Sequence, residues 1–412
     1  MIQTDACIVG AGPGGAATAL KLSYLGIPSV LIDKAQFPRD KICGDAISGK
    51  VTTLLKRLDP DILSRFDADP MQVDVWGMTF VAPNHQEIHI PFHPNMVQET
   101  QMAPGYVAKR VDFDHFLIQE IQRRDNIQWL EKVEITQYEK QPDGWLLSDD
   151  SGQVQVKTRM LIVADGAHSQ FSRKIAGLEK DSKHYAGAIR TYYKGVSGLD
   201  KRGFIELHFI KSLTPGYFWI FPLPNGLANV GLGMRSDILS KKKFNLRKEL
   251  EWVINEHPAI KARFQHAERL GPVMGYGLPL GSKRRSISGD HYMLVGDAGH
   301  LIDPLTGEGI GNAFYSGFIA AEQVQQCLLK NDFSAAFLKA YDQRVDRVLG
   351  SEMRLSYKLQ KMLAYPFLVN LLARIIAGNQ RISAVISGMY NDFSLREQLA
   401  KPLFWVKMWF KR

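Results

Sequence analysis

Three glycines between a predicted strand and a predicted helix constrain the fold of this chain more than any other feature. Residues 5–10 (DACIVG) have the composition of a buried strand, and residues 11–26 that of a helix rich in small residues. Gly10, Gly12 and Gly15 form a G-x-G-x-x-G turn between the two. In such a turn the first glycine allows a sharp bend, the second lets a pyrophosphate approach, and the third lets the helix pack on the strand. The turn therefore predicts a dinucleotide held at a helix N-terminus.

An acidic residue at the end of the next predicted strand strengthens this interpretation. Residues 28–33 (PSVLID) end at Asp33, 18 residues after Gly15, where a carboxylate accepts hydrogen bonds from a ribose. Lys34 follows directly, and we include it among the expected cofactor contacts. The sequence has one such unit, which favours a single dinucleotide that stays bound, and FAD fits this role better than NAD.

A second glycine-rich block supplies the stronger argument for FAD. Residues 294–314 (LVGDAGHLIDPLTGEGIGNAF) place Asp297 at the end of a predicted buried strand, where it can accept bonds from ribityl hydroxyls. Gly307 lies just before the start of the next predicted helix. The backbone amides of Gly309 and Ile310 at that start are expected to face the N1/O2 edge of a flavin, where negative charge gathers on reduction. An ordinary glycine-rich helix start explains the glycines but not Asp297 together with Pro304.

Nucleotide-type patterns thus recur at separated places, with β-rich sequence between them. We expect an α/β fold in which a Rossmann-type FAD-binding domain is assembled from discontinuous segments and a β-rich substrate domain is inserted into it. The FAD-binding domain is assigned to residues 1–70, 106–175 and 286–330. The substrate domain is assigned to residues 71–105 and 176–285, and a C-terminal helical region to residues 331–412.

The net charge and the cysteine content limit which classes of partner and which cellular compartment are expected. The net charge of +9 favours an anionic partner such as a phosphate-bearing ligand or an acidic membrane surface, and nucleic acid is not expected because no recognition motif or long basic run is present. Cys7, Cys43 and Cys327 lie far apart without a C-x-x-C pair, so we expect neither disulfides nor a metal site. With no charged leader and no apolar run of about 18 residues, the sequence suggests a cytoplasmic protein.

The C-terminal residues 398–412 (QLAKPLFWVKMWFKR) combine aromatic side chains with four basic ones and no acidic one. This composition suits the headgroup boundary of a membrane, so peripheral attachment to the inner membrane face is one expectation. A terminal helix docked on the protein core explains the same residues equally well.

Further blocks resemble a known family. Residues 39–45 (RDKICGD) contain the lysine, cysteine and glycine that geranylgeranyl reductases carry, and residues 215–226 (PGYFWIFPLPNG) match their Y-x-W-x-F-P pattern. The chain therefore resembles the geranylgeranyl reductase family, among flavoproteins of the para-hydroxybenzoate hydroxylase fold. The resemblance covers roughly residues 1–330 and adds the following expected cofactor contacts: Arg39, Cys43, Gly44, Arg110, Asp165 and Gly166. The chain departs from the family pattern in one position, since Asp45 stands where a glycine is common.

The resemblance implies that the chain reduces isolated C=C bonds of a prenyl lipid or prenyl diphosphate, using hydride from reduced FAD. The electron donor implied is NAD(P)H or reduced ferredoxin. Cys43, Tyr217 and Trp219 are then the candidate catalytic residues, with the thiol donating or relaying a proton and the aromatic side chains lining an apolar tunnel. Strand alternation would direct Tyr217, Trp219 and Phe221 to one face, and Phe218 and Ile220 to the other.

Other interpretations stay open. Cys43 also fits a small buried apolar residue, and aromatic side chains in strands are usually packed core. The shared cofactor blocks equally suit an FAD-dependent monooxygenase that hydroxylates an aromatic or polyketide-like compound. A flavin-bearing lipid carrier without catalysis is a third reading.

Overall fold

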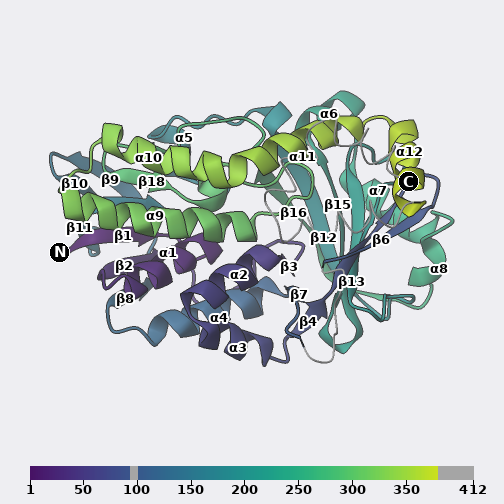
Figure 1. Cartoon of the computed structure of the whole chain (residues 1–412), viewed down its shortest axis with the longest axis horizontal. Coiled ribbons are helices and arrows are strands. Elements are labelled where there is room, and N and C mark those ends of the chain that lie inside the picture. Colours follow the sequence, from purple (N-terminus) through teal and green to yellow (C-terminus); the bar gives the residue numbers. More distant parts are fainter. Residues whose placement is uncertain (93–100, 379–412) are drawn as a thin grey trace.

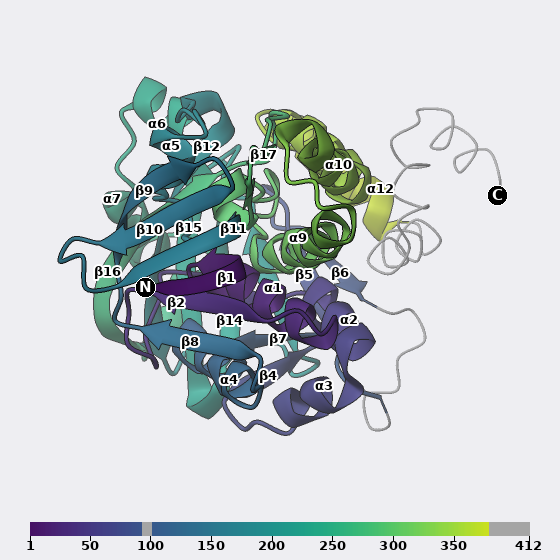
Figure 2. The same ribbon diagram turned by 90° about the vertical axis from the view of Figure 1, so that its left-hand side faces the viewer.

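Two large sheets lie at opposite ends of an elongated molecule, and long helices run along one side between them (Figure 1). The computed structural model describes residues 1–92 and 101–378. Figure 2 shows the same arrangement from the end that carries the N-terminus, with the strands of the first sheet nearest the viewer.

The first sheet contains the predicted nucleotide-binding strands. Its order is β17-β18-β11-β1-β2-β8, with β10 and β9 added beside β11. β1 runs parallel to both β11 and β2, and residues 6–9 of β1 are buried without alternation, as central parallel strands are. The strands are β1 (Ile2–Val9), β2 (Ser29–Asp33), β8 (Ile127–Glu131), β9 (Ile135–Gln141), β10 (Gly144–Asp149), β11 (Gln155–Val163), β17 (Ser288–Gly289) and β18 (Tyr292–Leu294).

Small residues let two helices of this part pack closely. A Cβ on Gly317 of α9 would lie 2.7 Å from the carbonyl oxygen of Gly14 in α1, so the two backbones approach each other directly. The elements of this part are α1 (Pro13–Tyr24), α2 (Gly49–Leu58), α3 (Pro60–Asp67), α4 (Arg110–Gln122), α5 (Gln170–Lys174), the short η3 (Gly296–Gly299) and α9 (Ile310–Lys330).

The second sheet has seven strands in the order β16-β12-β15-β14-β13-β5-β6. One face packs on α7, where Leu250 and Val253 join Phe218 and Ile220 in an apolar core. Its strands are β5 (Gly77–Val81), β6 (Glu87–Pro91), β12 (Tyr185–Lys194), β13 (Phe204–His208), β14 (Tyr217–Leu223), β15 (Leu227–Arg235) and β16 (Glu268–Pro279). The helices beside it are η1 (Ser182–His184), η2 (Pro224–Gly226), α6 (Ser236–Lys242), α7 (Leu246–Asn255) and α8 (Lys261–Phe264).

A small sheet lies between the two large ones (Figure 1). It consists of β3 (Ala46–Ile47), β7 (Gly105–Ala108) and β4 (Gln72–Val75). β3 follows the RDKICGD segment directly, so this sheet anchors the segment from its C-terminal side.

The last described elements are helical. α10 (Ala335–Val345), the π-helical turn η4 (Asp346–Gly350) and α11 (Ser351–Met362) lead to α12 (Pro366–Ala377). α12 packs on the second sheet, where Val369 and Ala373 are buried against its apolar residues. Within the described residues, no single helix has the length and apolar character to span a membrane, although the bent pair of residues 335–362 and 366–377 meets that test jointly.

The predicted fold class is confirmed: an α/β fold with a Rossmann-type parallel sheet carries a β-rich part and a C-terminal helical region. The division of the chain into domains at the stated residues stays a prediction. The aromatic, basic segment 398–412 lies outside the described residues.

Candidate functional site

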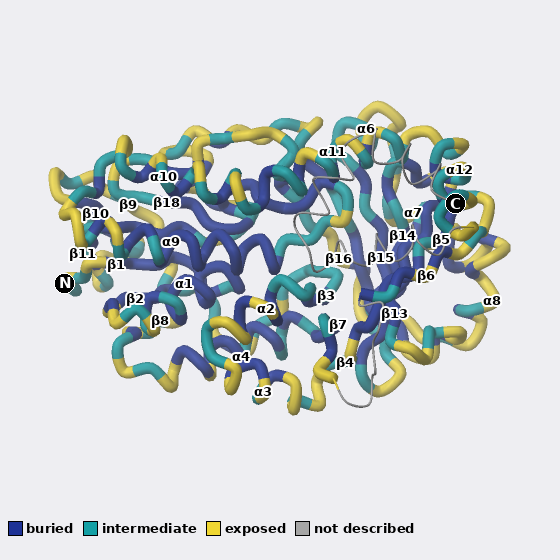
Figure 3. The backbone as a smooth tube through the Cα atoms, viewed as in Figure 1, coloured by how far each residue is buried: buried dark blue, intermediate teal, exposed yellow. Residues whose placement is uncertain are grey.

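A cavity of about 940 Å³ lies where the first sheet, the second sheet and the helices α9, α11 and α12 meet. It begins at the glycine turn after β1 and reaches α12, whose Leu372 and Ile376 line it. Figure 3 shows that most of α9 and of the central strands of both large sheets is buried. Residues far apart in the sequence line this one cavity.

The glycine turn brings its backbone to the edge of this cavity. Gly10 has φ +99°, and a Cβ on Gly15 would lie 1.8 Å from the Gly10 carbonyl oxygen, so both positions require glycine for the turn itself. Gly12 differs, because its φ is −67° and the nearest atom to an added Cβ is Arg39 Nη2 at 3.7 Å. Gly12 lines the cavity and leaves room for a phosphate at the N-terminus of α1.

Asp33 fixes the conformation of this turn. Its Oδ2 accepts a hydrogen bond of 2.7 Å from the Ala11 amide, and its Oδ1 one of 2.8 Å from the Ala35 amide. Its carboxylate therefore ties the end of β2 to the glycine turn and keeps lone pairs for a ribose. The adjacent Lys34 is exposed and pairs with Glu134 at 2.8 Å, outside the cavity lining.

Two arginines lie over the turn and share one carboxylate. Arg39 Nη1 is 2.6 Å from Asp114 Oδ2, and Arg110 donates to the same side chain from Nε at 2.7 Å and Nη2 at 2.6 Å. Asp114 is fully buried, so it holds both guanidinium groups near Gly12. They provide positive charge where a pyrophosphate would lie.

The remaining expected cofactor contacts converge on the same region. Asp165 follows β11 beside Gly10, and Gly166 lines the cavity with φ +84°. Asp297 in η3 also lines it and forms an ion pair of 3.3 Å with Lys41 Nζ. The open turn at Gly12 and these carboxylates fit FAD, because they match its phosphates and its ribose and ribityl hydroxyls.

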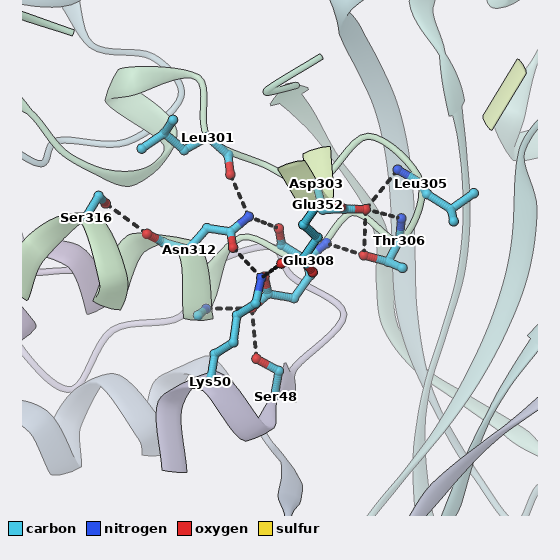
Figure 4. Close-up of polar contacts among 11 residues, drawn as sticks. Ser48, Lys50, Leu301, Asp303, Leu305, Thr306, Glu308, Asn312, Ser316 and Glu352 are labelled. Carbon is cyan, nitrogen blue, oxygen red and sulfur yellow. Dashed lines mark hydrogen bonds and ion pairs between the residues drawn. The ribbon is translucent and has the colours of Figure 1, made fainter. Parts of the chain in front are cut away.

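A polar loop precedes α9 on the other side of the cavity (Figure 4). Asp303 Oδ1 accepts from the amides of Leu305 and Thr306 and from the Thr306 hydroxyl, which shapes the loop that contains Pro304 and Gly307. This loop leads to Gly309, the N-cap of α9, and to Ile310, its first residue. These predicted positions line the cavity.

A charged cluster that no sequence motif predicted lies beside that loop. Lys50 Nζ lies 2.7 Å from Asn312 Oδ1, 2.9 Å from Glu352 and 3.5 Å from Glu308 (Figure 4). The members come from α2, the loop before α9, α9 itself and α11, so no local motif connects them. Glu308 also accepts from the Ser48 hydroxyl at 2.9 Å, which joins the loop to the N-cap of α2.

An aromatic wall closes the cavity along β14. Tyr217, Trp219 and Phe221 line the cavity, whereas Phe218 and Ile220 are buried in the core on the opposite face, so the predicted alternation is confirmed. Tyr217 donates its hydroxyl proton to the Thr306 carbonyl and so connects the wall to the polar loop. A Cβ on Gly44 would lie 3.3 Å from the Phe221 ring, so the Cys43–Gly44 backbone faces this wall closely.

One asparagine joins the wall to the cysteine loop, and sequence analysis missed it. Asn229 on β15 accepts from Trp219 Nε1 at 2.9 Å and donates to the Cys43 carbonyl at 2.8 Å and to Asp45 Oδ2 at 2.8 Å. Asn229 is fully buried, so all its contacts are with the protein. A polar residue among the small and apolar ones of residues 226–233 (GLANVGLG) was the available signal.

Cys43 itself lines the cavity with an uncharged thiol. Burial raises the pKa of Cys43, and the guanidinium of Arg110 opposes that rise without cancelling it. At neutral pH the side chain therefore carries its proton. The cysteine, the aromatic wall and the glycine turn border the same space.

Comparison with known proteins agrees with this geometry. Residues 3–195 match the FAD binding domain family. Digeranylgeranylglycerophospholipid reductase 2 of Methanosphaera stadtmanae is 28% identical over 369 residues, covering 88% of each chain, and menaquinone reductase of Mycolicibacterium smegmatis is 29% identical, covering 78% of this chain and 76% of its own. A geranylgeranyl bacteriochlorophyll reductase-like protein from Thermoplasma acidophilum superposes with a TM-score of 0.80 at 25% identity, over 92% of each chain. The chain is thus an FAD-binding flavoprotein oxidoreductase that resembles the geranylgeranyl reductases.

Proposed function

We propose that this protein reduces carbon–carbon double bonds in the chain of a prenyl lipid. The observation that carries the proposal is the lining of the cavity. It is polar at the glycine turn and the α9 N-terminus, and it becomes apolar toward α12. The apolar part is lined by Val75, Met78, Phe80, Ile205, Leu207 and Ile376.

Such a space suits a long hydrocarbon chain, because burying apolar surface favours binding by about 25 cal/mol per Å². It contrasts with the compact pocket with several hydrogen-bonding groups that a small aromatic substrate needs. Relatives named for a digeranylgeranyl glycerophospholipid and for menaquinone support the prenyl class.

The residues that would hold FAD are the glycine turn, Asp33, Arg39, Arg110, Asp297 and the α9 N-terminus. Reduced FAD supplies a hydride when it is bound. The donor that reduces it is proposed to be NAD(P)H or reduced ferredoxin.

The protein's own side chains have three proposed roles at the double bond. Cys43 holds a proton on its sulfur at the cavity surface, ready for the second carbon of the alkene. Tyr217 and Trp219 exclude water and hold the chain, each fixed by a hydrogen bond on its polar end.

A lipid substrate also implies contact with a membrane, and we place the protein at its cytoplasmic face. Phe367 and Leu371 on α12 are 66% and 49% exposed, while Leu372 and Ile376 of the same helix line the cavity. Sedimentation with vesicles of anionic and of neutral lipids would test this attachment, and recovery of all the protein in the supernatant with both would refute it.

Anaerobic flavin reoxidation tests the reaction directly. The purified protein is reduced with dithionite, and prenyl lipids are added one at a time while the oxidised flavin absorbance is followed. We expect one lipid class to restore that absorbance and to gain two hydrogens per turnover, whereas its fully saturated analogue leaves the absorbance unchanged. Reoxidation only by oxygen in the presence of a small aromatic compound, with an oxygenated product, would establish a monooxygenase instead.

Two tryptophan substitutions on α12 test the path of the chain. Ile376→Trp fills the far end of the cavity, and we expect it to slow reduction of long prenyl chains by at least about tenfold while sparing short ones. Ala377→Trp, at an exposed position of the same helix that does not line the cavity, is the matched control. Equal effects of both substitutions would place the substrate elsewhere.

A further inference from the structure

Asp45 is a buried carboxylate without a role in the proposed reaction as described above. It lies two residues after Cys43, immediately before β3, and lines the cavity although the residue is fully buried by the surrounding protein. Its φ of +67° is in the left-handed region, which aspartate adopts more readily than most residues but which favours glycine. Glycine would adopt this backbone conformation at a lower free-energy cost than aspartate does.

The two carboxylate oxygens of Asp45 have different surroundings. Oδ2 accepts from the Tyr192 hydroxyl at 2.9 Å and from Asn229 Nδ2 at 2.8 Å. Oδ1 is buried and has no hydrogen-bond partner among the described residues. An asparagine could accept the same two bonds through its single oxygen, so holding Tyr192 and Asn229 does not require a carboxylate. The second oxygen is available for a proton.

Cys43 belongs to the same loop and lies two residues before Asp45. Besides burial, the charge of Asp45 raises the pKa of Cys43 and the guanidinium of Arg110 lowers it, so both groups lie close enough to act on the thiol. Asn229 binds both the Cys43 carbonyl and the Asp45 carboxylate, which keeps the two residues in one fixed unit.

Charged groups surround Asp45 from several elements. Arg190 and Tyr192 face it from β12, Arg110 faces it from α4, and Lys41 lies in its own segment. Burial raises the pKa of Asp45 to about 6, although the bonds from Asn229 and Tyr192 and the charge of Arg190 pull it down. Arg190 Nη2 donates to Asp40 Oδ2 at 2.8 Å, and the negative charge of Asp40 weakens the effect of Arg190 on the pKa of Asp45. Near neutral pH both forms of Asp45 are accessible.

We propose that Asp45 is the proton reservoir that recharges Cys43 after each reduction. An alkene that takes a hydride at one carbon takes a proton at the other, and this proton leaves the Cys43 thiol as its S–H bond breaks. The thiolate then takes the proton of Asp45 through a water in the cavity: the Oδ1–H bond breaks as the water accepts that proton, the water gives up one of its own to the sulfur, a new S–H bond forms, and Asp45 is left as a carboxylate. A proton from the solvent restores the neutral carboxyl group of Asp45 before the next turnover, so no redox partner is needed in this step.

In this scheme Asp45 acts through Cys43 and is a positioning and proton-storing residue. The inference rests on the proposed reduction. It does not rest on the identity of the lipid.

Thiol alkylation provides a test that needs no substrate. The FAD-loaded protein is treated with iodoacetamide from about pH 5 to about pH 8, and labelling of Cys43 is measured by mass spectrometry. In Asp45→Asn the carboxylate charge beside the thiol is absent, so labelling should match the unsubstituted protein near pH 5 and exceed it about tenfold near pH 8. Asp61→Asn, at an exposed carboxylate of α3, is the matched control and should follow the unsubstituted protein.

The inference would be overturned if the ratio of Cys43 labelling in Asp45→Asn to that in the unsubstituted protein stayed constant with pH. Failure of iodoacetamide to label Cys43 in both proteins at every pH would also overturn it, because the thiol would then be sealed from the cavity.

Turnover provides the second readout. With the lipid that reoxidises the flavin, Asp45→Asn should complete its first reduction at a rate within about threefold of normal, since Cys43 starts with a proton. Later turnovers should slow by about tenfold or more. An equal loss in the first and later turnovers would indicate a merely structural role. If no lipid reoxidises the flavin, the proposed function fails, and the alkylation profile still decides whether Asp45 and Cys43 titrate together.

Discussion

The two ends of the cavity are built in different ways. At the glycine turn backbone atoms shape the space for FAD, and the guanidinium groups of Arg39 and Arg110 lie beside it. At the cysteine loop the important groups are side chains that meet from distant strands: Asn229 and Cys43 are 186 residues apart. The difference teaches that one end is defined by a short local motif and the other only by the folded structure.

The largest expected effect is at the glycine turn. Gly15→Ala places a Cβ 1.8 Å from the Gly10 carbonyl oxygen, so we expect the free energy of unfolding to fall by at least about 4 kcal/mol, with loss of bound FAD. Urea unfolding and the flavin absorbance of the purified protein measure both.

Gly12→Ala sharpens this prediction, because its Cβ has no protein atom closer than 3.7 Å. We expect its free energy of unfolding to change by less than about 1 kcal/mol, while FAD is lost because the methyl group occupies the phosphate space. If Gly12→Ala retains FAD with normal affinity, the phosphates do not lie at this turn.

The same difference explains what could be predicted from the sequence. The glycine turn and the α9 start were predictable because each depends on residues within one short segment. The FAD-binding fold was predictable because several such segments recur along the chain. The alternation of Tyr217, Trp219 and Phe221 was predictable from strand geometry, and the structure confirms it.

Asn229, Tyr192 and the cluster around Lys50 were not predictable, because their meaning depends on which strands and helices meet. Asp45 was visible only as a departure from a family pattern. Its burial against β12 and β15, which makes a carboxylate there unusual, has no signature in the local sequence.

Asn229→Ala should have the largest effect at the cysteine loop. It removes hydrogen bonds to Trp219, to the Cys43 carbonyl and to Asp45, all within the protein interior, so we expect a loss of about 3 kcal/mol of unfolding free energy at neutral pH. The loss should be smaller near pH 5, where Asp45 is neutral and needs fewer donors. Urea unfolding at the two pH values measures this, and identical losses at both would argue against an ionised Asp45.

Asp45→Asn should change the pH dependence of stability. Because the pKa of Asp45 is raised to about 6 in the folded protein, the folded state binds more protons than the unfolded state between about pH 4 and about pH 6. As the pH rises from about 4 to about 6, the unfolding free energy of the unsubstituted protein should therefore fall by about 2 kcal/mol relative to that of Asp45→Asn. Parallel curves for the two proteins would mean that the carboxylate has an ordinary pKa in the folded state.

Lys34→Ala should have the smallest effect on stability and on FAD affinity. It tests whether Lys34, next to the turn, only pairs with Glu134 at the surface or also binds FAD. The ion pair with Glu134 is exposed on both sides, at 69% and 59%, so solvent screens it and its removal should change the unfolding free energy by less than about 0.5 kcal/mol. The ammonium group points to Glu134 and not into the cavity, so we expect FAD affinity, measured by flavin titration of the apoprotein, to change by less than about threefold. Glu134→Ala frees the lysine and is the matched variant. A tenfold loss of FAD affinity in Lys34→Ala but not in Glu134→Ala would assign Lys34 to the cofactor, and would extend the FAD site beyond the backbone-defined turn to a surface side chain.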